Sequence, residues 1–164
     1  MVFKNQFLTF LTFAFAILLS TTVTLSQDYE QTMTDYSEKF LAYSQVFVKF
    51  ASMNINTEAE YDAALAVSDV AKEFYYHTSY LSDFLLILKI INKHEEEKEL
   101  AARLLRLRIN NLIKECDEAF KRVDAAVKDA EFADVTKAAS DVKTDLEALR
   151  HDLEKISANY AKEG

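Results

Sequence analysis

The sequence predicts an all-α protein: an up-down-up-down antiparallel four-helix bundle with coiled-coil-like packing, preceded by an N-terminal signal segment. Two observations support this fold class. The 164-residue chain has no proline and a single glycine, Gly164, so the commonest helix terminators are missing from residues 27–163. Apolar residues recur there at alternating steps of three and four, the spacing of a helix with one buried stripe. A few long helices satisfy both observations.

Residues 1–26 have the composition of a secretory signal peptide. Lys4 supplies the positive n-region, and residues 7–19 form a hydrophobic region that only two threonines interrupt. Ser26 is a small residue of the kind that precedes the cleavage site. We therefore expect this segment to be removed, leaving residues 27–164 as one four-helix bundle domain in an extracytoplasmic compartment, either secreted or periplasmic.

A retained membrane anchor is the alternative for the N-terminal segment. Residues 5–27 carry no charge, and about 20 apolar residues are enough to span a bilayer. Residues 20–26 are rich in serine and threonine, which suits a cleavage region better than a membrane exit. We expect membrane contact only if the segment is retained or if the protein binds lipid.

The charge balance is acidic, and this bears on the choice of partner. Removing the signal takes away Lys4 and no acidic residue, so 18 basic residues stand against 27 acidic ones and the formal charge moves from −8 to −9. Nucleic acid is not an expected partner, because phosphate-binding surfaces are basic. Cys116 is the single cysteine, so no internal disulfide can form. Its place in an apolar stripe predicts a small buried hydrophobe rather than a nucleophile.

The first helix is expected over residues 28–53, and its apolar stripe is almost entirely aromatic. The stripe consists of Tyr29, Met33, Tyr36, Phe40, Tyr43, Phe47 and Phe50. After this stripe the heptad frame slips by one residue, and Thr57 with Glu60 three positions later forms a capping box. A turn is therefore expected around residues 54–57.

The second helix is expected over residues 58–91. Its stripe consists of Ala63, Val67, Val70, Phe74, His77, Leu81, Phe84, Leu88 and Ile91. Residues 92–99 form a polar run, yet the heptad frame continues in phase across it. One unbroken helix as far as residue 128 is therefore an alternative. We favour a hairpin, because helices of matched length and short connections are typical of a bundle.

The third and fourth helices are expected over residues 96–128 and 132–161. The third stripe consists of Ala102, Leu105, Ile109, Leu112, Cys116, Ala119, Val123 and Ala126. The fourth consists of Phe132, Val135, Ala139, Val142, Leu146, Leu149, Leu153, Ile156 and Tyr160. The frame shifts by two residues near positions 129–131, which indicates a turn, and Asp134 offers an alternative N-cap.

His77 is the one residue at an expected core position that suggests chemistry. One interpretation is a neutral imidazole hydrogen-bonded to a hydroxyl such as that of Tyr36 or Thr78. The other uses the hairpin geometry: if the first two helices reverse around residues 54–57, Met33 lies level with His77. A methionine and a histidine facing each other in a core could bind a haem iron.

With its signal peptide, its four helices and Met33 near the mature N-terminus, the chain resembles the periplasmic cytochrome b562 type of bundle. That resemblance implies a b-type haem, held in the family by a methionine and a histidine of the last helix. Here the last-helix histidine, His151, is expected to face solvent, and the Cys-x-x-Cys-His motif of c-type relatives is absent. We therefore expect no cofactor, with haem on Met33 and His77 as an alternative.

Other metal sites of helical bundles are not expected. The Glu-x-x-His pairs of ferritin-like di-iron proteins and the His-Glu-x-x-His motif of zinc enzymes do not occur in the sequence. We therefore expect no metal.

The second helix is more hydrophobic than a single buried stripe requires. Residues 84–91 are apolar apart from Lys89. An outward-facing set, which we name the tyrosine–isoleucine face, consists of Tyr76, Tyr80, Asp83, Ile87 and Ile90. Such a face often marks an interface for a protein partner or a second copy of the chain. The alternative is a second helix that packs more centrally than its neighbours.

These observations predict a helical-bundle protein that acts by binding or assembly. Catalysis is not expected, because no carboxylate pair and no nucleophile with a base falls on an inward face. An alternative resembles the exchangeable apolipoproteins, which are secreted and rich in long amphipathic helices. That resemblance implies a carrier of lipid or of another hydrophobic ligand.

Overall fold

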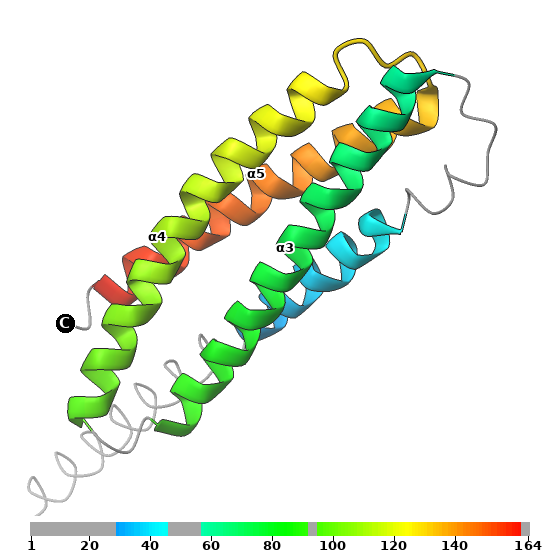
Figure 1. Cartoon of the computed structure of the whole chain (residues 1–164). Helices are drawn as coiled ribbons and strands as arrows, with labels where there is room; N and C mark the ends of the chain where they lie inside the picture. The colour runs from blue at the N-terminus through cyan, green and yellow to red at the C-terminus, as the bar shows by residue number, and fades with distance from the viewer. Residues whose placement is uncertain (1–28, 46–56, 92–94, 162–164) are drawn as a thin grey trace, which may run out of the picture.

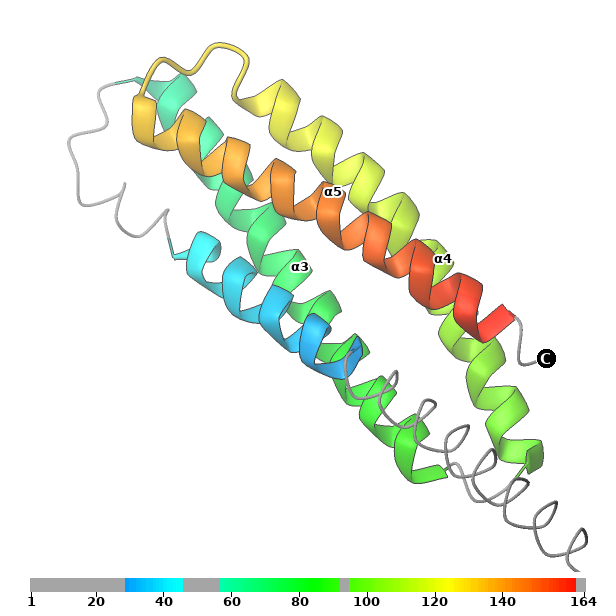
Figure 2. The same ribbon diagram turned by 180° about the vertical axis from the view of Figure 1, so that it is seen from behind.

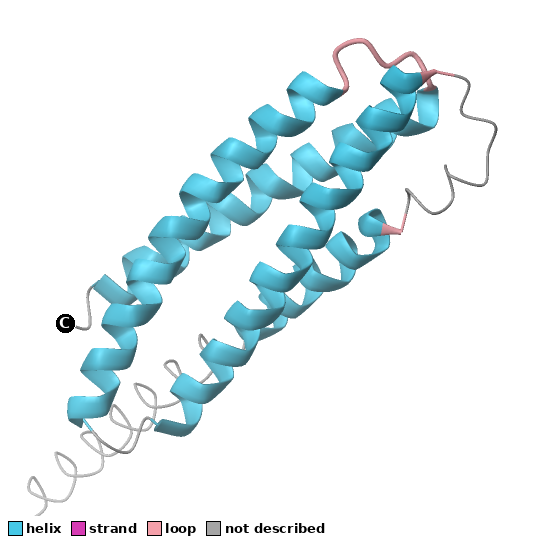
Figure 3. Cartoon of the chain, in the orientation of Figure 1, coloured by secondary structure: helices cyan, strands magenta, loops and turns pink. Residues whose placement is uncertain are grey.

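The computed structural model describes residues 29–45, 57–91 and 95–161. This part of the chain is all helical and contains four helices and no strand, which confirms the predicted class (Figure 3). An N-terminal helix covers residues 29–44. It is followed by α3 (Glu58–Ile91), α4 (Glu95–Ala126) and α5 (Ala133–Ala161).

The four helices pack side by side around one core (Figures 1 and 2). The N-terminal helix contacts α3 through Thr34 and Ser82, whose hydroxyl oxygens are 2.9 Å apart. On its other side it contacts α5. Salt bridges and hydrogen bonds join α4 to both α3 and α5. The core therefore receives side chains from all four helices.

The apolar stripes read from the sequence form most of this core. Phe40, Phe74, Leu112 and Leu146, one from each helix, are buried. The rings of Phe40 and Phe74 pack with their centroids 5.6 Å apart. Burying side chains of this size stabilises the fold by about 1.5 to 3 kcal/mol each. The prediction that Phe132 belongs to the core was wrong: this residue lies just before α5 and is 40% exposed.

The buried stripe of α3 is broader than predicted. Ala64, Ala71, Thr78 and Leu85 are buried, although the sequence frame left them out, whereas His77 is only partly buried. The reason is that α3 lies between the N-terminal helix and α4 (Figure 1), so two neighbours cover it from two sides. Thr78 satisfies its hydroxyl locally by donating to the carbonyl oxygen of Phe74 at 2.7 Å.

Polar ladders run along both edges of α5. At one edge, three tyrosines of the N-terminal helix contact α5 at intervals of seven residues. The pairs are Tyr29–Asn159, Tyr36–Asp152 and Tyr43–Asp145. At the other edge α4 provides a second series, Asp124–Lys143, Asp117–Arg150 and Asn110–Ser157. In both ladders the residue numbers rise along one helix as they fall along the other.

The tyrosine ladder explains how phenols fit into a core stripe. Tyr36 and Tyr43 donate hydrogen bonds to Asp152 at 3.0 Å and to Asp145 at 2.8 Å. Burial, followed by these bonds to carboxylates, raises the pKa of both phenols above the ordinary value. Lys39 approaches the same Asp145 carboxylate at 2.8 Å. The rings are therefore packed inward while the hydroxyls are satisfied at the edge.

At the start of α3 only one of the two hydrogen bonds of the predicted capping box is formed. The backbone N–H of Glu60 donates to the Thr57 hydroxyl at 3.3 Å. The Glu60 side chain does not complete the box: its carboxylate accepts from the backbone N–H groups of Glu131 and Phe132, at 2.7 and 2.9 Å. It places a negative charge beside the first turn of α5, where the helix dipole favours it. Asp134 lies inside that first turn, so it is not the N-cap.

The break between α3 and α4 was predicted as a hairpin, and the two helices are separate. Only residues 92–94 lie between them. The predicted signal peptide and residues 46–53 of the first helix lie outside the described residues. Among the helices that the structure describes, none combines the length and the hydrophobicity needed to cross a bilayer.

Candidate functional site

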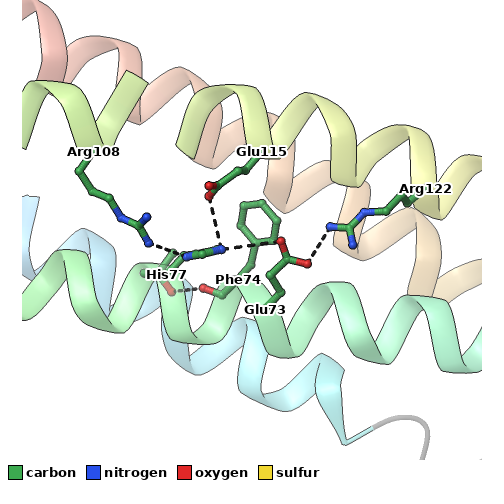
Figure 4. Close-up of polar contacts among 7 residues, drawn as sticks. Glu73, Phe74, His77, Arg108, Glu115 and Arg122 are labelled. Carbon is green, nitrogen blue, oxygen red and sulfur yellow. Dashed lines mark hydrogen bonds and ion pairs between the residues drawn. The ribbon is translucent and has the colours of Figure 1, made fainter. Parts of the chain in front are cut away.

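A cluster of charged side chains bridges α3 and α4 around His77 (Figure 4). Glu73 and His77 come from successive turns of α3, and Arg108, Glu115 and Arg122 come from α4 at intervals of seven residues. We name these five residues the His77 cluster. The imidazole packs edge-on against the ring of Phe74, with centroids 5.6 Å apart. His77 therefore has one apolar neighbour toward the core and three charged ones around it, Glu73, Arg108 and Glu115.

The contacts of His77 define its tautomer. An Nη atom of Arg108 lies 2.8 Å from Nδ1 of His77. A guanidinium group can only donate, so Nδ1 must accept and carries no proton. The proton of the neutral ring is then on Nε2, which faces carboxylate oxygens of Glu115 at 3.4 Å and Glu73 at 3.7 Å. A neutral imidazole thus matches a donor on one side and two acceptors on the other.

This arrangement differs from the predicted environment of His77. The hydroxyl of Tyr36 is bonded to Asp152, and that of Thr78 to a backbone carbonyl, so neither is the partner of the ring. The side chain of His77 is 20% exposed at the outer edge between α3 and α4. The histidine is satisfied, as one interpretation held, but by charged groups of α4 that the sequence frame did not place beside it.

Chemically, the His77 cluster links two helices. Glu73 extends the link by pairing with Arg122 at 2.7 Å through its second oxygen. Oε2 of Glu115 is buried and has no hydrogen bond, so its contact with His77 is purely electrostatic. Within the described residues no group of three or more His, Cys, Asp or Glu side chains could hold a metal ion. Of the two imidazole nitrogens, Nδ1 is bonded to Arg108 and Nε2 faces the two carboxylates without a hydrogen bond.

Met33 and His77, the alternative haem ligands, lie at different levels along α3 in the structure. Met33 is fully buried in the core. Its neighbour Thr34 contacts Ser82, so Met33 lies near residues 81–82 of α3. That level is about 7 Å along the helix from His77, at 1.5 Å per residue. The other histidine considered, His151, has a side chain that is 68% exposed, as expected.

Cys116 is buried in the core, as predicted. Burial raises the pKa of its thiol to about 12, and the nearby carboxylates of Asp117 and Glu115 act in the same direction. A thiol of this kind is a poor nucleophile near neutral pH. Cys116 therefore acts as a packed apolar side chain of the hydrophobic core.

The tyrosine–isoleucine face points to solvent. Tyr76, Tyr80 and Ile87 are 46%, 64% and 48% exposed, and Asp83 is exposed between them. The rings of Tyr76 and Tyr80 stack with centroids 6.5 Å apart. The side chain of Ile90 lies outside the described residues. Four of the five residues thus form an open surface on α3.

A second exposed apolar stripe, on α4, was not predicted. Leu100, Leu104 and Leu107 are 60%, 49% and 60% exposed, and we name them the leucine stripe. Their spacing of four and three repeats that of the core stripe on the opposite side of α4. The signal was present in the sequence, but it is hidden when only one apolar stripe is assigned to each helix.

The leucine stripe and the tyrosine–isoleucine face lie at the same end of the α3–α4 pair. The C-terminal end of α3 and the N-terminal end of α4 are neighbours (Figure 1). Tyr80 and Ile87 follow His77 along α3, and the stripe precedes Arg108 along α4. Because His77 contacts Arg108, the leucine stripe and all of the tyrosine–isoleucine face except Tyr76 lie between that contact and this end of the molecule.

Comparisons of the chain with protein-family models, with curated proteins and with solved structures found no match.

Proposed function

We propose that the chain is an extracytoplasmic helical-bundle protein that acts by binding or assembly, through the outer surface of α3 and α4, and not by catalysis. One observation carries the proposal. Among the described residues ten large hydrophobic side chains are exposed. Eight of them lie on α3 and α4, and all of these except Tyr61 lie in the C-terminal part of α3 or the N-terminal part of α4. The seven are Tyr76, Tyr80, Leu86, Ile87, Leu100, Leu104 and Leu107. Scattered exposed apolar residues are normal, whereas a gathered set is typical of a binding surface.

The proposal includes an up-down-up-down antiparallel topology. The two polar ladders along α5 support it, because their residue numbers run in opposite directions on the paired helices. The α3–α4 hairpin and the contact of the N-terminal helix with both α3 and α5 are consistent with the same order. This topology gives the exposed apolar residues a rigid support.

The extracytoplasmic location is proposed from residues 1–26 alone. Their charged start, apolar run and small residues are typical of a cleaved signal. Fractionation of expressing cells followed by N-terminal sequencing tests it. We expect the exported protein to begin at Gln27. A cytoplasmic protein that retains Met1 would contradict this part of the proposal.

Photo-crosslinking in expressing cells tests the binding surface. A photoreactive amino acid at position 80 should form adducts with protein, because Tyr80 is the most exposed residue of the surface. The same group at Leu41, an exposed apolar residue of the N-terminal helix, is the control. Adducts at position 80 and not at position 41 support the proposal. Lipid adducts at position 80 would favour the lipid-carrier alternative, and no adduct at either position would contradict both.

A further inference from the structure

We infer that the leucine stripe of α4 pairs with the same stripe of a second copy of the chain, in antiparallel orientation about a two-fold axis near Leu104. The inference rests on the proposed function, because it names the partner of the proposed binding surface.

The spacing of the stripe is the first argument. Leu100, Leu104 and Leu107 follow one another at steps of four and three, on the side of α4 that faces away from the core. Two helices that each present such a row can interlock along it, as they do in coiled coils. The stripe therefore has the geometry of a helix-pairing seam, but it has no partner helix within the described residues.

Charge complementarity is the second argument, and it identifies the occupant. The same face of α4 continues with Glu97 before the stripe, and with Asn111 and Lys114 after it, again at steps of three and four. All three are exposed. Within the described residues neither Glu97 nor Lys114 forms an ion pair, although Asp117 and Arg122 of the same helix do. From Glu97 to Lys114 the row is thus apolar in its centre, negative at one end and positive at the other, and the exposed Glu118 follows beyond Lys114.

Such a pattern is complementary to itself when one copy is reversed. With Leu104 facing Leu104 of the copy, Leu100 faces Leu107 and Glu97 faces Asn111. Lys114 then lies about 4.5 Å further along the partner helix, at 1.5 Å per residue, within reach of Glu97. A parallel pair would instead bring Glu97 against Glu97 and Lys114 against Lys114, which is unfavourable. The antiparallel two-fold pair is therefore selected, and its interface uses the same patch on both copies.

A dimer interface would have to include residues beside the leucine stripe. A stable interface removes about 800 Å² from solvent on each partner, which is more than three leucines provide. Tyr80 and Ile87 of α3 lie at the same end of the molecule and are about half exposed or more. They provide further exposed apolar area at that end.

Sedimentation velocity of the purified chain tests the inference. We expect a dimer that Leu104→Lys converts to monomer, with at least a tenfold higher dissociation constant. Leu41→Lys places the same charge on the N-terminal helix and should leave the dimer intact. Circular dichroism of each variant checks the fold. A wild-type protein that stays monomeric, or a dimer that tolerates Leu104→Lys, would overturn the inference.

Charge exchange tests the orientation without removing a leucine. Glu97→Lys and Lys114→Glu should each weaken the dimer several-fold, and the two together should restore it. Failure of the double variant to restore the dimer would overturn the antiparallel pairing.

Cysteine trapping gives an independent test. The natural Cys116 is buried, so only the introduced cysteine should form a disulfide between two copies. Under mild oxidation Leu104→Cys should link to itself. Leu100→Cys should link only when mixed with Leu107→Cys, because these positions face each other across the axis. Self-linking of Leu100→Cys would indicate a parallel pair and would contradict the inference.

These results separate the inference from the proposed function. A monomer in solution whose position 80 crosslinks to a different protein would retain the binding function and overturn the dimer. A monomer without any protein adduct would overturn both.

Discussion

Tyr36 donates a 3.0 Å hydrogen bond to Asp152 and so joins the N-terminal helix to α5 across 116 residues of chain. The ring of Tyr36 is buried beside Phe40, with centroids 6.4 Å apart, while its hydroxyl reaches the edge of the core. Tyr43 repeats the arrangement seven residues later with Asp145. The aromatic stripe of the N-terminal helix therefore provides both packing and helix-to-helix hydrogen bonds.

Removing the Tyr36 hydroxyl should weaken this connection. We expect Tyr36→Phe to lower the free energy of unfolding by about 1 kcal/mol, the net value of one hydrogen bond. Urea denaturation measures the change. Tyr80→Phe removes an exposed hydroxyl from α3 and should change stability by less than about 0.5 kcal/mol. Equal effects of the two substitutions would show that the bond to Asp152 contributes nothing.

Phe74 is the largest side chain that α3 places in the core. Phe74→Ala should lower the free energy of unfolding by about 3 to 5 kcal/mol, through lost burial and the cavity left behind. Leu41→Ala, at an exposed position, should cost less than about 1 kcal/mol. A loss below about 1 kcal/mol for Phe74→Ala would show that α3 is rotated relative to this structure.

The tautomer of His77 can be observed directly. Nitrogen-15 NMR of the imidazole should show a proton on Nε2 and an unprotonated Nδ1 in the neutral ring, because Arg108 can only donate to Nδ1. Arg108→Leu removes that donor and should shift the Nδ1 resonance, whereas the resonances of the exposed His151 should not move. A neutral ring with its proton on Nδ1 would contradict the contact with Arg108.

Cys116 should react slowly with alkylating reagents. With a pKa of about 12, roughly one thiol in 10⁴ is ionised at pH 8. Mass spectrometry should show little labelling by iodoacetamide in the folded protein and rapid labelling in urea, with Cys116→Ala as the unlabelled control. Fast labelling without denaturant would mean that the thiol is accessible.

The raised pKa of the Cys116 thiol also predicts how the stability of the folded protein changes at high pH. The pKa of Cys116 in the folded state is raised above the ordinary value of 9.0. Its stabilising contribution is therefore complete below pH 9 and is lost as the pH rises toward 12. We expect Cys116→Ala to reduce the decline in melting temperature over that range. Identical declines for the two proteins would contradict the assigned shift.

The candidate surface was only half predicted. Tyr76, Tyr80 and Ile87 could be assigned to an outer face because they fall outside the stripe of their helix. The leucine stripe was not predicted, because one apolar stripe was assigned to each helix and the sequence leaves open whether a second set of apolar residues is buried or exposed. That choice depends on which side of α4 its neighbours cover.

Local periodicity was enough to determine the helices, the approximate ends of α3, α4 and α5, and the burial of Phe40, Phe74, Leu112 and Leu146. In a helix the spacing of apolar residues fixes which of them share a face. Only the tertiary structure decided how far each helix is rotated toward its neighbours. Helix rotation placed His77 beside Arg108, and the offset of the N-terminal helix along α3 set Met33 at another level. The contact of the Glu60 carboxylate with the start of α5 also depends on how the helices pack. Such contacts join residues far apart in the sequence, so no local pattern specifies them.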